Sequence, residues 1–267
     1  MTLREARLGT VSFTAMTYNL WGDHFIDERL DALRALFELR PPDILGTQEL
    51  TPRLQALLDE ALPDHDRVHD DFPGWSARSN IWWRRDVFEL IEHGHHDIGL
   101  LAENGALFWT RLRPLGAPAP HELLFSTSHL TFQRHPAELA DLRNRRVPQA
   151  RATVAELERL SPEGAVIFTA DINDVAAAQL ELGLAGYRDC FTALGRHMPA
   201  THPVPAAASL EGIWSPTSPL AGVAKGIDVI FARGALAART AEAVDFHHRG
   251  RVASDHMPVV ATYTFLA

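Results

Sequence analysis

The chain has 267 residues, of which 46% are hydrophobic and 22% charged, a composition that excludes a largely disordered protein. Its 25 Lys and Arg residues against 34 Asp and Glu residues give a net charge of −9, which disfavours non-specific attraction to a nucleic-acid backbone. No apolar run reaches the roughly 18 residues of a membrane span, and Met1 to Thr10 lacks the apolar stretch of a signal peptide. Cys190 is the single cysteine, so no intramolecular disulfide can form. We expect one domain over residues 1–267, monomeric and cytoplasmic.

The first half of the chain alternates patterns typical of strands and helices. A strand is predicted over Val11 to Leu20, a helix around Leu30 to Phe37, a strand over Asp43 to Gln48 and a helix over Leu54 to Leu62 that Pro63 ends. An antiparallel meander is predicted next, over Asn80 to Arg84, Val87 to Glu92, Ala106 to Leu112 and Leu123 to His129.

The second half continues this mixture. Pro136 to Leu160 is mostly helical, and Pro148 is expected to kink or divide that helix. A strand over Ala165 to Ala170, a helix near Val175 to Leu182, long loops from His197 to Val223 and two closing strands, Gly226 to Ala232 and Met257 to Phe265, complete the prediction. This order favours an α/β (α+β) four-layered sandwich, with two mixed sheets packed face to face and helices outside.

Acidic, amide and imidazole side chains recur where the predicted strands end, so that one rigid scaffold can bring them into a single cleft. Six segments carry them: Thr17 to Trp21, Gly46 to Glu49, Ser128 to Leu130, Thr169 to Asn173, Ile227 to Ile230 and Ser254 to Pro258. Each segment alone has ordinary explanations, such as a helix cap or a turn. Asp228 is the exception, because it lies within an apolar strand and needs a partner to offset the cost of desolvation.

Taken in order, these segments resemble the endonuclease/exonuclease/phosphatase superfamily, which has the deoxyribonuclease-I-like fold. The resemblance runs from Asn19 to His256 and includes Asn80 to Asp86, which is similar to the family's central strand. It implies hydrolysis of a phosphoester with Mg²⁺ as cofactor, or Mn²⁺ in its place. Carboxylate oxygen suits such a hard cation, which neutralises the charge that keeps a nucleophile away from phosphate. The resemblance makes Glu49 the main metal ligand, with Asn19 and Asp255 nearby.

The same resemblance implies the catalytic residues. His256 would be the general base for the attacking water, because imidazole titrates nearest neutral pH. Asp228 would accept a hydrogen bond from its other ring nitrogen, as the acid of a serine-protease triad does. Asp171 and Asn173 would orient the water and hold a phosphate oxygen, and His129 would contact the phosphate and protonate the leaving oxygen. An ordinary hydrogen-bonded histidine at a strand end remains the alternative for His129.

Two residues are assigned to substrate binding, Asn80 and Arg146. Arg146 lies in an Arg-rich window with Gln149, which is either a solvated helix face or a support for the region of His129. The chain's departures from the family pattern include two single-residue replacements. Ala170 replaces a Gly, and Gly226 replaces the Arg that often lies two residues before the residue equivalent to Asp228. The nearest basic residue is Lys225, one residue earlier. Which residue supports the cleft in place of this Arg is therefore an open question.

Alternatives concern mainly the substrate. The acidic charge and the lack of a basic arm favour a small phosphoester or a lipid-like or nucleotide-like substrate over DNA or RNA, although an endo- or exonuclease remains the second hypothesis. A zinc site on His93, His95, His96, His247 and His248 fits no standard spacing, and the sequence lacks the nucleophile elbow of serine hydrolases. A catalytically inactive binding protein is disfavoured because every proposed catalytic group is present.

Overall fold

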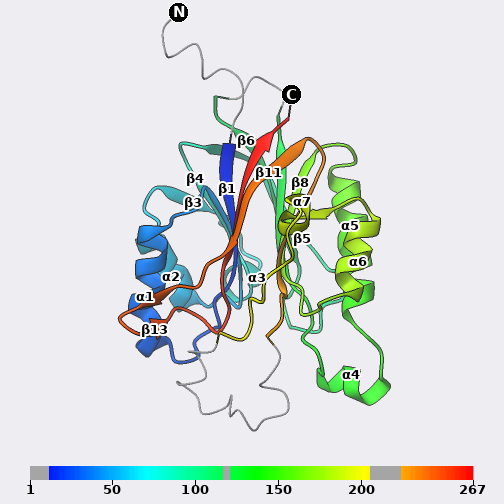
Figure 1. Cartoon of the computed structure of the whole chain (residues 1–267), viewed down its shortest axis with the longest axis horizontal. Coiled ribbons are helices and arrows are strands. Elements are labelled where there is room, and N and C mark those ends of the chain that lie inside the picture. The colour runs from blue at the N-terminus through cyan, green and yellow to red at the C-terminus, as the bar shows by residue number, and fades with distance from the viewer. Residues whose placement is uncertain (1–11, 117–120, 205–223, 267) are drawn as a thin grey trace, which may run out of the picture.

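The computed structural model describes residues 12–116, 121–204 and 224–266. Within them, two six-stranded mixed sheets pack face to face, as predicted from the sequence (Figure 1). Across the first sheet the strands are β11 (Leu236–Ala243), β14 (Val259–Phe265), β1 (Ser12–Asn19), β2 (Ile44–Gln48), β4 (Ile81–Arg84) and β3 (His65–Arg67). Across the second they are β5 (Phe88–His96), β6 (Leu107–Pro114), β7 (Leu123–His129), β8 (Ala165–Asp171), β10 (Asp228–Arg233) and β9 (Arg188–Asp189). A separate small pair joins β12 (His247–His248) to β13 (Arg251–Val252).

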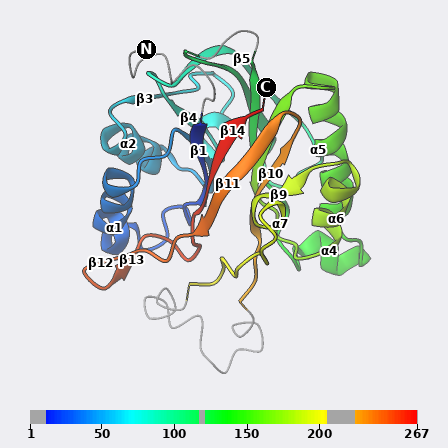
Figure 2. The same cartoon turned by 45° about the horizontal axis from the view of Figure 1, so that its top comes forward.

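Helices cover the outer face of each sheet and complete the four layers (Figures 1 and 2). On the first sheet lie α1 (Ile26–Leu39) and α2 (Pro52–Ala61), whose Leu33 and Leu58 pack in one cluster with Tyr18. On the second lie α5 (Arg146–Leu160) and α6 (Ala177–Leu184), whose Leu157 and Leu182 pack with Phe168. The short helices are α3 (Gly74–Ala77), α4 (Pro136–Asp141) and α7 (Cys190–Ala193). Among the described residues, no helix is long and apolar enough to cross a membrane.

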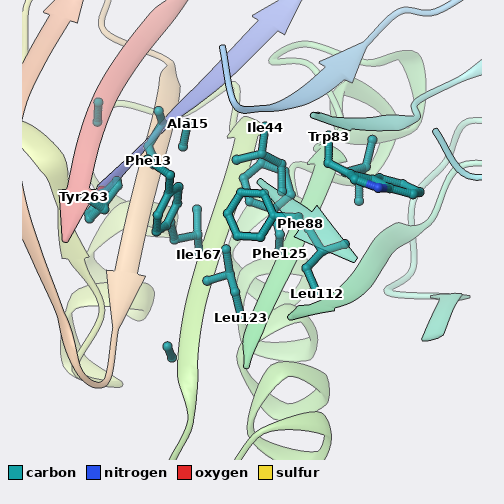
Figure 3. Packing of buried hydrophobic residues seen from close by; sticks show 14 of the residues in the cluster. Phe13, Ala15, Ile44, Trp83, Phe88, Leu112, Leu123, Phe125, Ile167 and Tyr263 are labelled. Carbon is teal, nitrogen blue, oxygen red and sulfur yellow. The ribbon is translucent and has the colours of Figure 1, made fainter. Parts of the chain in front are cut away.

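A third apolar cluster fills the space between the two sheets. Figure 3 shows Phe13 and Ile44 of the first sheet facing Phe125 and Ile167 of the second, and each is at most 1% exposed. Because both faces of the central strands are covered, these strands read as continuous apolar runs rather than as alternating ones. All seven residues of β8 are buried.

Strand pairing brings the polar strand ends to one end of the sandwich. β1 and β2 are parallel and pair Asn19 with Gln48, while β7 and β8 are parallel and pair His129 with Asp171. β10 runs antiparallel to β8, so its first residue, Asp228, pairs with the last residue of β8, Asp171. The fold therefore places the candidate catalytic side chains side by side where the two sheets meet.

Three expectations about the elements need correction. β4 pairs with β2 in the first sheet, so the antiparallel meander contains only β5, β6 and β7. β11 was not predicted, since its Ala-rich sequence has a single β-branched residue, Thr240. Its pairing with β14 makes it a strand. The predicted helix from Pro136 to Leu160 is divided at Leu142, which has a φ of +57°, and not at Pro148. Pro148 lies in the first turn of α5, where the missing N–H costs no helical hydrogen bond.

Candidate active site

A buried Asp–His pair lies at the centre of the site. Asp228 is 0% exposed and His256 6% exposed, and Nδ1 of His256 lies 2.9 Å and 3.1 Å from the two carboxylate oxygens of Asp228. The Asp228 carboxylate therefore accepts the Nδ1 proton, which directs Nε2 of the ring toward the site. Nε2 lies 3.8 Å from a carboxylate oxygen of Asp171 and 3.8 Å from one of Asp255.

Asp171 connects the residues that the two sheets contribute. Its Oδ2 accepts a 2.9 Å hydrogen bond from the Asn19 amide of the first sheet and lies 3.5 Å from Nε2 of His129. Its Oδ1 accepts the backbone N–H of Asn173 at 3.0 Å. This turn gives Asn173 a φ of +50° and directs its amide nitrogen to 3.0 Å from Nε2 of His129. Asp171 and Asn173 thus converge through an Asx-type turn beyond the end of the strand, and not through strand alternation.

Glu49 and Asn19 form the oxygen-rich side of the site. The Asn19 side-chain nitrogen donates to Glu49 at 3.0 Å as well as to Asp171, while its side-chain oxygen accepts the backbone N–H of Trp21 at 2.9 Å. Glu49 has a φ of +51°, a conformation that L residues adopt at a cost and that recurs at functional sites. In this geometry the Asn19 amide nitrogen links the two carboxylates. The amide would have to rotate before its oxygen could bind a cation.

Charges inside the site shift the pKa values of its members. Burial alone would lower the pKa of His256, but the negative charges of Asp228, Asp255 and Asp171 outweigh it and raise that pKa well above its usual range. Burial would likewise raise the pKa of Asp255, but the positive fields of His256, His202 and Arg29 hold it below its usual value. For Asp171, burial is the larger effect and its pKa is raised. The site thus holds more negative charge than His256 alone can balance.

This donor set fits a hard divalent cation. Asn19, Glu49, Asp171 and Asp255 offer carboxylate and amide oxygen, the ligand type that Mg²⁺ and Mn²⁺ prefer. Buried carboxylates so close together also need a positive charge to offset their repulsion. Among the described residues, two groups have three donor atoms close enough to share one ion: His202 with Asp255 and His256, and Asp171 with Asp228 and His256.

Three residues outside the predicted set also shape the site. Arg29 is fully buried on the apolar face of α1, and its guanidinium donates to the backbone carbonyls of Trp21, Gly22, His24 and Ala253, which fixes the loop after β1 against the segment before His256. The sequence could have indicated that Arg29 is buried, because it lies at helical spacing from apolar residues.

The other two missed residues, Thr201 and His202, lie in the segment that was interpreted only as a long loop. The Thr201 hydroxyl accepts the backbone N–H groups of Ile227 at 3.1 Å and Asp228 at 3.2 Å. His202 lies 3.5 Å from Asp255, and its ring centroid is 4.3 Å from that of His256. Residues 205–223 of this predicted loop lie outside the described part of the chain.

Arg146 and Gln149 hold the chain just beyond His129. Arg146 is 4% exposed, donates to the Thr131 carbonyl at 2.9 Å and forms a 2.6 Å ion pair with Glu138. The Gln149 side chain accepts the Thr131 N–H at 3.1 Å and donates to its hydroxyl at 2.8 Å. These contacts favour the interpretation of both residues as supports for the His129 region over that of a solvated helix face.

Asn80 is committed to the backbone. Its side chain accepts the N–H groups of Val68 and Ile81 and donates to the carbonyls of Val68 and Trp75, at 2.7–3.2 Å. These bonds use both ends of the amide, so Asn80 holds the segment before β4 in place, and its contact with substrate stays a prediction.

Gly226, the departure from the family pattern, has a steric explanation. A Cβ at this position would lie 2.6 Å from the Pro199 carbonyl oxygen, so the chain cannot carry an arginine there without moving residues 198 and 199. The neighbouring Lys225 instead donates to the Gln133 side chain at 3.0 Å.

A pocket of about 340 Å³ opens beside the site. It is lined by Glu49 and His129 and by apolar side chains that include Leu50, Leu100 and Phe132. A second lobe of about 220 Å³ shares Leu100, His129 and Phe132 with it. Apolar side chains therefore line the pocket directly beside the polar groups of the site, as in many small-molecule sites.

The chain belongs to the Endonuclease/Exonuclease/phosphatase family, whose model matches residues 16–256. This match contains every residue of the predicted site and shows that the resemblance inferred from the strand ends is real.

Solved structures of differently named proteins share this fold. A humanized TDP2 from D. rerio is 20% identical over 94% of this chain and 98% of its own, with a TM-score of 0.72. A mannosyl-6-phosphatase from Bacteroides thetaiotaomicron is 18% identical over 95% of this chain and 100% of its own, with a TM-score of 0.71. The human Nocturnin catalytic domain, with bound sulfate, is 15% identical over 96% of this chain and 97% of its own, with a TM-score of 0.70. Curated protein sequences give no match.

Proposed function

We propose that the protein is a Mg²⁺-dependent phosphoester hydrolase in which the Asp228–His256 pair activates the attacking water. The observation that carries the proposal is the 2.9 Å contact between Asp228 and Nδ1 of His256, both buried. It fixes the ring so that Nε2 faces the space bounded by Asp171 and Asp255. A histidine held in one tautomer by a buried carboxylate is the arrangement that general-base catalysis requires.

The other residues position the phosphoester. Glu49, with Asn19 and Asp255, would hold the cation, which when bound supplies positive charge to the phosphate oxygens. Asn173 and His129 lie 3.0 Å apart, and Nε2 of His129 lies 3.5 Å from Asp171, so they can donate to a phosphate oxygen and to the leaving group. Asp171 accepts from Asn19 and orients that amide between the two sheets.

The pocket favours a small phosphoester, or one attached to a lipid-like or nucleotide-like group. Its apolar side chains, Leu100 and Phe132 among them, lie next to His129, so an apolar or ring-shaped substituent on the phosphate gains contact there. The net charge of −9 opposes long-range attraction to polynucleotides. One neighbouring structure, D. rerio TDP2, is a complex with a single-strand DNA product, so nucleic acid belongs in the test.

The test is a substrate screen with and without metal. Phosphomonoesters, phosphodiesters, phospholipids, single-stranded oligonucleotides and plasmid DNA are incubated with the protein in Mg²⁺, in Mn²⁺ and in excess EDTA. We expect hydrolysis of a small or lipid-like phosphoester that EDTA abolishes and that His256→Ala lowers by ~10² or more. Full activity in EDTA, or an unchanged rate in the variant, would contradict the mechanism, and preferred cleavage of DNA would move the nuclease hypothesis to first place.

A further inference from the structure

Two imidazoles and a carboxylate converge on one side of the candidate active site. Nε2 of His202 lies 3.5 Å from Oδ2 of Asp255, and Nε2 of His256 lies 3.8 Å from Oδ1 of the same carboxylate. The two rings are 4.3 Å apart between centroids, and each of the three residues has a donor atom within 4.8 Å of the others. Ligand atoms around a tetrahedral Zn²⁺ ion, with bonds of about 2.0–2.1 Å, are separated by about 3.3 Å. Small side-chain shifts would therefore bring these donors onto one ion.

The chemistry of this group differs from that of Glu49 and its neighbours. Two nitrogen donors and one oxygen donor suit a borderline-soft ion such as Zn²⁺, whereas Mg²⁺ prefers oxygen alone. The His256 ring is also held as a metal-binding imidazole usually is, because its other nitrogen donates to the Asp228 carboxylate. Three protein ligands leave a fourth position for water, the pattern of an open zinc site.

This group is a better candidate than the second cluster with suitable spacing. Asp171, Asp228 and His256 are all buried, and the Asp228 carboxylate is already bound to Nδ1 of His256. His202, by contrast, keeps 19% of its side chain exposed and gives an ion a route from solvent. The histidines considered for a zinc site from the sequence do not form a group of three ligands among the described residues. His93 forms an ion pair with Asp70, and His247 forms one with Asp245.

We propose that His202, Asp255 and His256 form a Zn²⁺ site whose occupation inhibits hydrolysis. An ion bound to Nε2 of His256 takes the lone pair that would accept the proton of the attacking water. It also occupies Asp255, which is then lost to Mg²⁺. The inhibitory part of this inference rests on the proposed function, while the metal site itself does not.

Binding is measured first, on the full chain after EDTA treatment and dialysis. Zn²⁺ is titrated by calorimetry, and Co²⁺, which reports tetrahedral nitrogen and oxygen ligation in its visible spectrum, is titrated by absorption. We expect one Zn²⁺ per chain that tenfold excess Mg²⁺ does not displace, and at least ~10-fold weaker binding by His202→Ala. His247→Ala removes a surface histidine that also pairs with a carboxylate, at 2.8 Å, and serves as the matched control with unchanged affinity.

Inhibition is measured next, on a substrate found in the screen, with each variant compared with its own zinc-free rate. Half-inhibition should require at least ~10-fold more Zn²⁺ in His202→Ala than in the parent or in His247→Ala. His202→Gln, which keeps a side chain of similar reach, repeats the test if the alanine variant has a lowered Tm. Equal Zn²⁺ affinity and equal inhibition in the His202 variants and the parent would overturn the site. Zn²⁺ binding that depends on His202 in a protein with no phosphoesterase activity would uphold the site and reject the proposed function.

Discussion

The two halves of the space between the sheets are built from the same strands but from different residue types. Far from the site, the inward-facing positions of β1, β2, β7 and β8 carry Phe13, Ile44, Phe125 and Ile167. Two residues further along β7 and β8, the same face carries Thr127 and Thr169, and four residues further along β1 and β2 it carries Thr17 and Gln48. One more step of two brings Asn19, His129 and Asp171. Alternate residues of a strand lie on the same face, so the face that carries the apolar core at one end of a strand carries the site residues at the other end.

The polar side chains between the sheets form hydrogen bonds with other groups of the protein. The Gln48 side-chain nitrogen donates to Thr127 at 2.8 Å and to Thr17 at 3.1 Å, and the Thr169 hydroxyl donates to the Ser126 carbonyl at 2.8 Å. Gly46 lies at the boundary between the halves, where a Cβ would meet the Thr169 hydroxyl at 2.4 Å. From this close approach of the sheets we infer that the apolar half supplies stability, while the hydrogen-bonded half fixes the distance between the two sets of candidate catalytic residues.

The largest expected effect lies at the catalytic end. Asp228→Asn keeps the shape of the side chain but presents a neutral group to Nδ1 of His256, so both the useful tautomer and the charged ring lose support. We expect kcat to fall ~10³-fold while the Mg²⁺ concentration for half-maximal activity stays nearly constant. Kinetics on a confirmed substrate measure both quantities.

The matched control is Asp245→Asn, which alters an exposed Asp–His pair of 2.8 Å with His247 and should leave kcat unchanged. A large rise in the Mg²⁺ requirement of Asp228→Asn, with nearly full activity at saturating metal, would make Asp228 a metal ligand and remove the dyad.

The next effect is one of stability, in the apolar half. Ile167 is 0% exposed, and Ile167→Ala leaves a cavity between the sheets that costs about 2–5 kcal/mol of unfolding free energy. Urea unfolding measures this loss, with Ile91→Ala, at a side chain 38% exposed, as the control. Below the unfolding transition, kcat should stay close to that of the parent. A loss of kcat as large as that of Asp228→Asn would show that the two halves do not have separate roles.

The third effect concerns the metal. Glu49→Gln removes a charged ligand while its amide can still accept from Asn19, so we expect about a tenfold rise in the Mg²⁺ requirement. Glu60→Gln, in an exposed ion pair with Arg34, is the control. If Mg²⁺ titrations of Glu49→Gln and the parent coincide, Glu49 is not the main ligand.

A smaller effect is expected in the polar half. Thr127→Val keeps the shape but deprives the Gln48 amide of its 2.8 Å partner, which should cost about 1 kcal/mol of stability. Because Gln48 pairs with Asn19 across the strands, kcat should also fall by several-fold, unlike in Ile167→Ala. A loss of stability with an unchanged kcat would show that the hydrogen bonds between the sheets do not position the site.

The sequence was sufficient to predict the family and the layers, because both follow from local patterns and from motif order. Asn19 and Asp171 were predicted because polar side chains recur where buried strands end, and Asp228 because a carboxylate within an apolar strand has to be compensated. Thr201 and His202 were missed because their loop has no periodicity. Backbone hydrogen bonds of this loop to Lys225, Asp255 and Met257 bring them to Asp228 and Asp255. β11 was missed for a related reason, since an alanine-rich edge strand is determined by the partner strand and not by its own residues.

The smallest effect concerns His65, a buried histidine near the end of the sandwich where the apolar half lies. Its ring is 7% exposed, and Nε2 lies 2.6 Å from the Pro42 carbonyl oxygen. Burial holds the pKa of His65 below its ordinary value of 6.5, although the contact with Pro42 opposes this. Between this lowered pKa and pH 6.5 the unfolded chain therefore binds a proton that the folded chain does not. The stability from neutral His65 is complete above pH 6.5 and is lost as the pH falls from there through the folded pKa. Unfolding free energies at about pH 7.5 and about pH 5.5 should show a smaller loss in His65→Gln than in the parent. His69→Gln, at a side chain 67% exposed, should behave like the parent, and an equal loss in His65→Gln would mean that the ring is charged without cost in the folded protein.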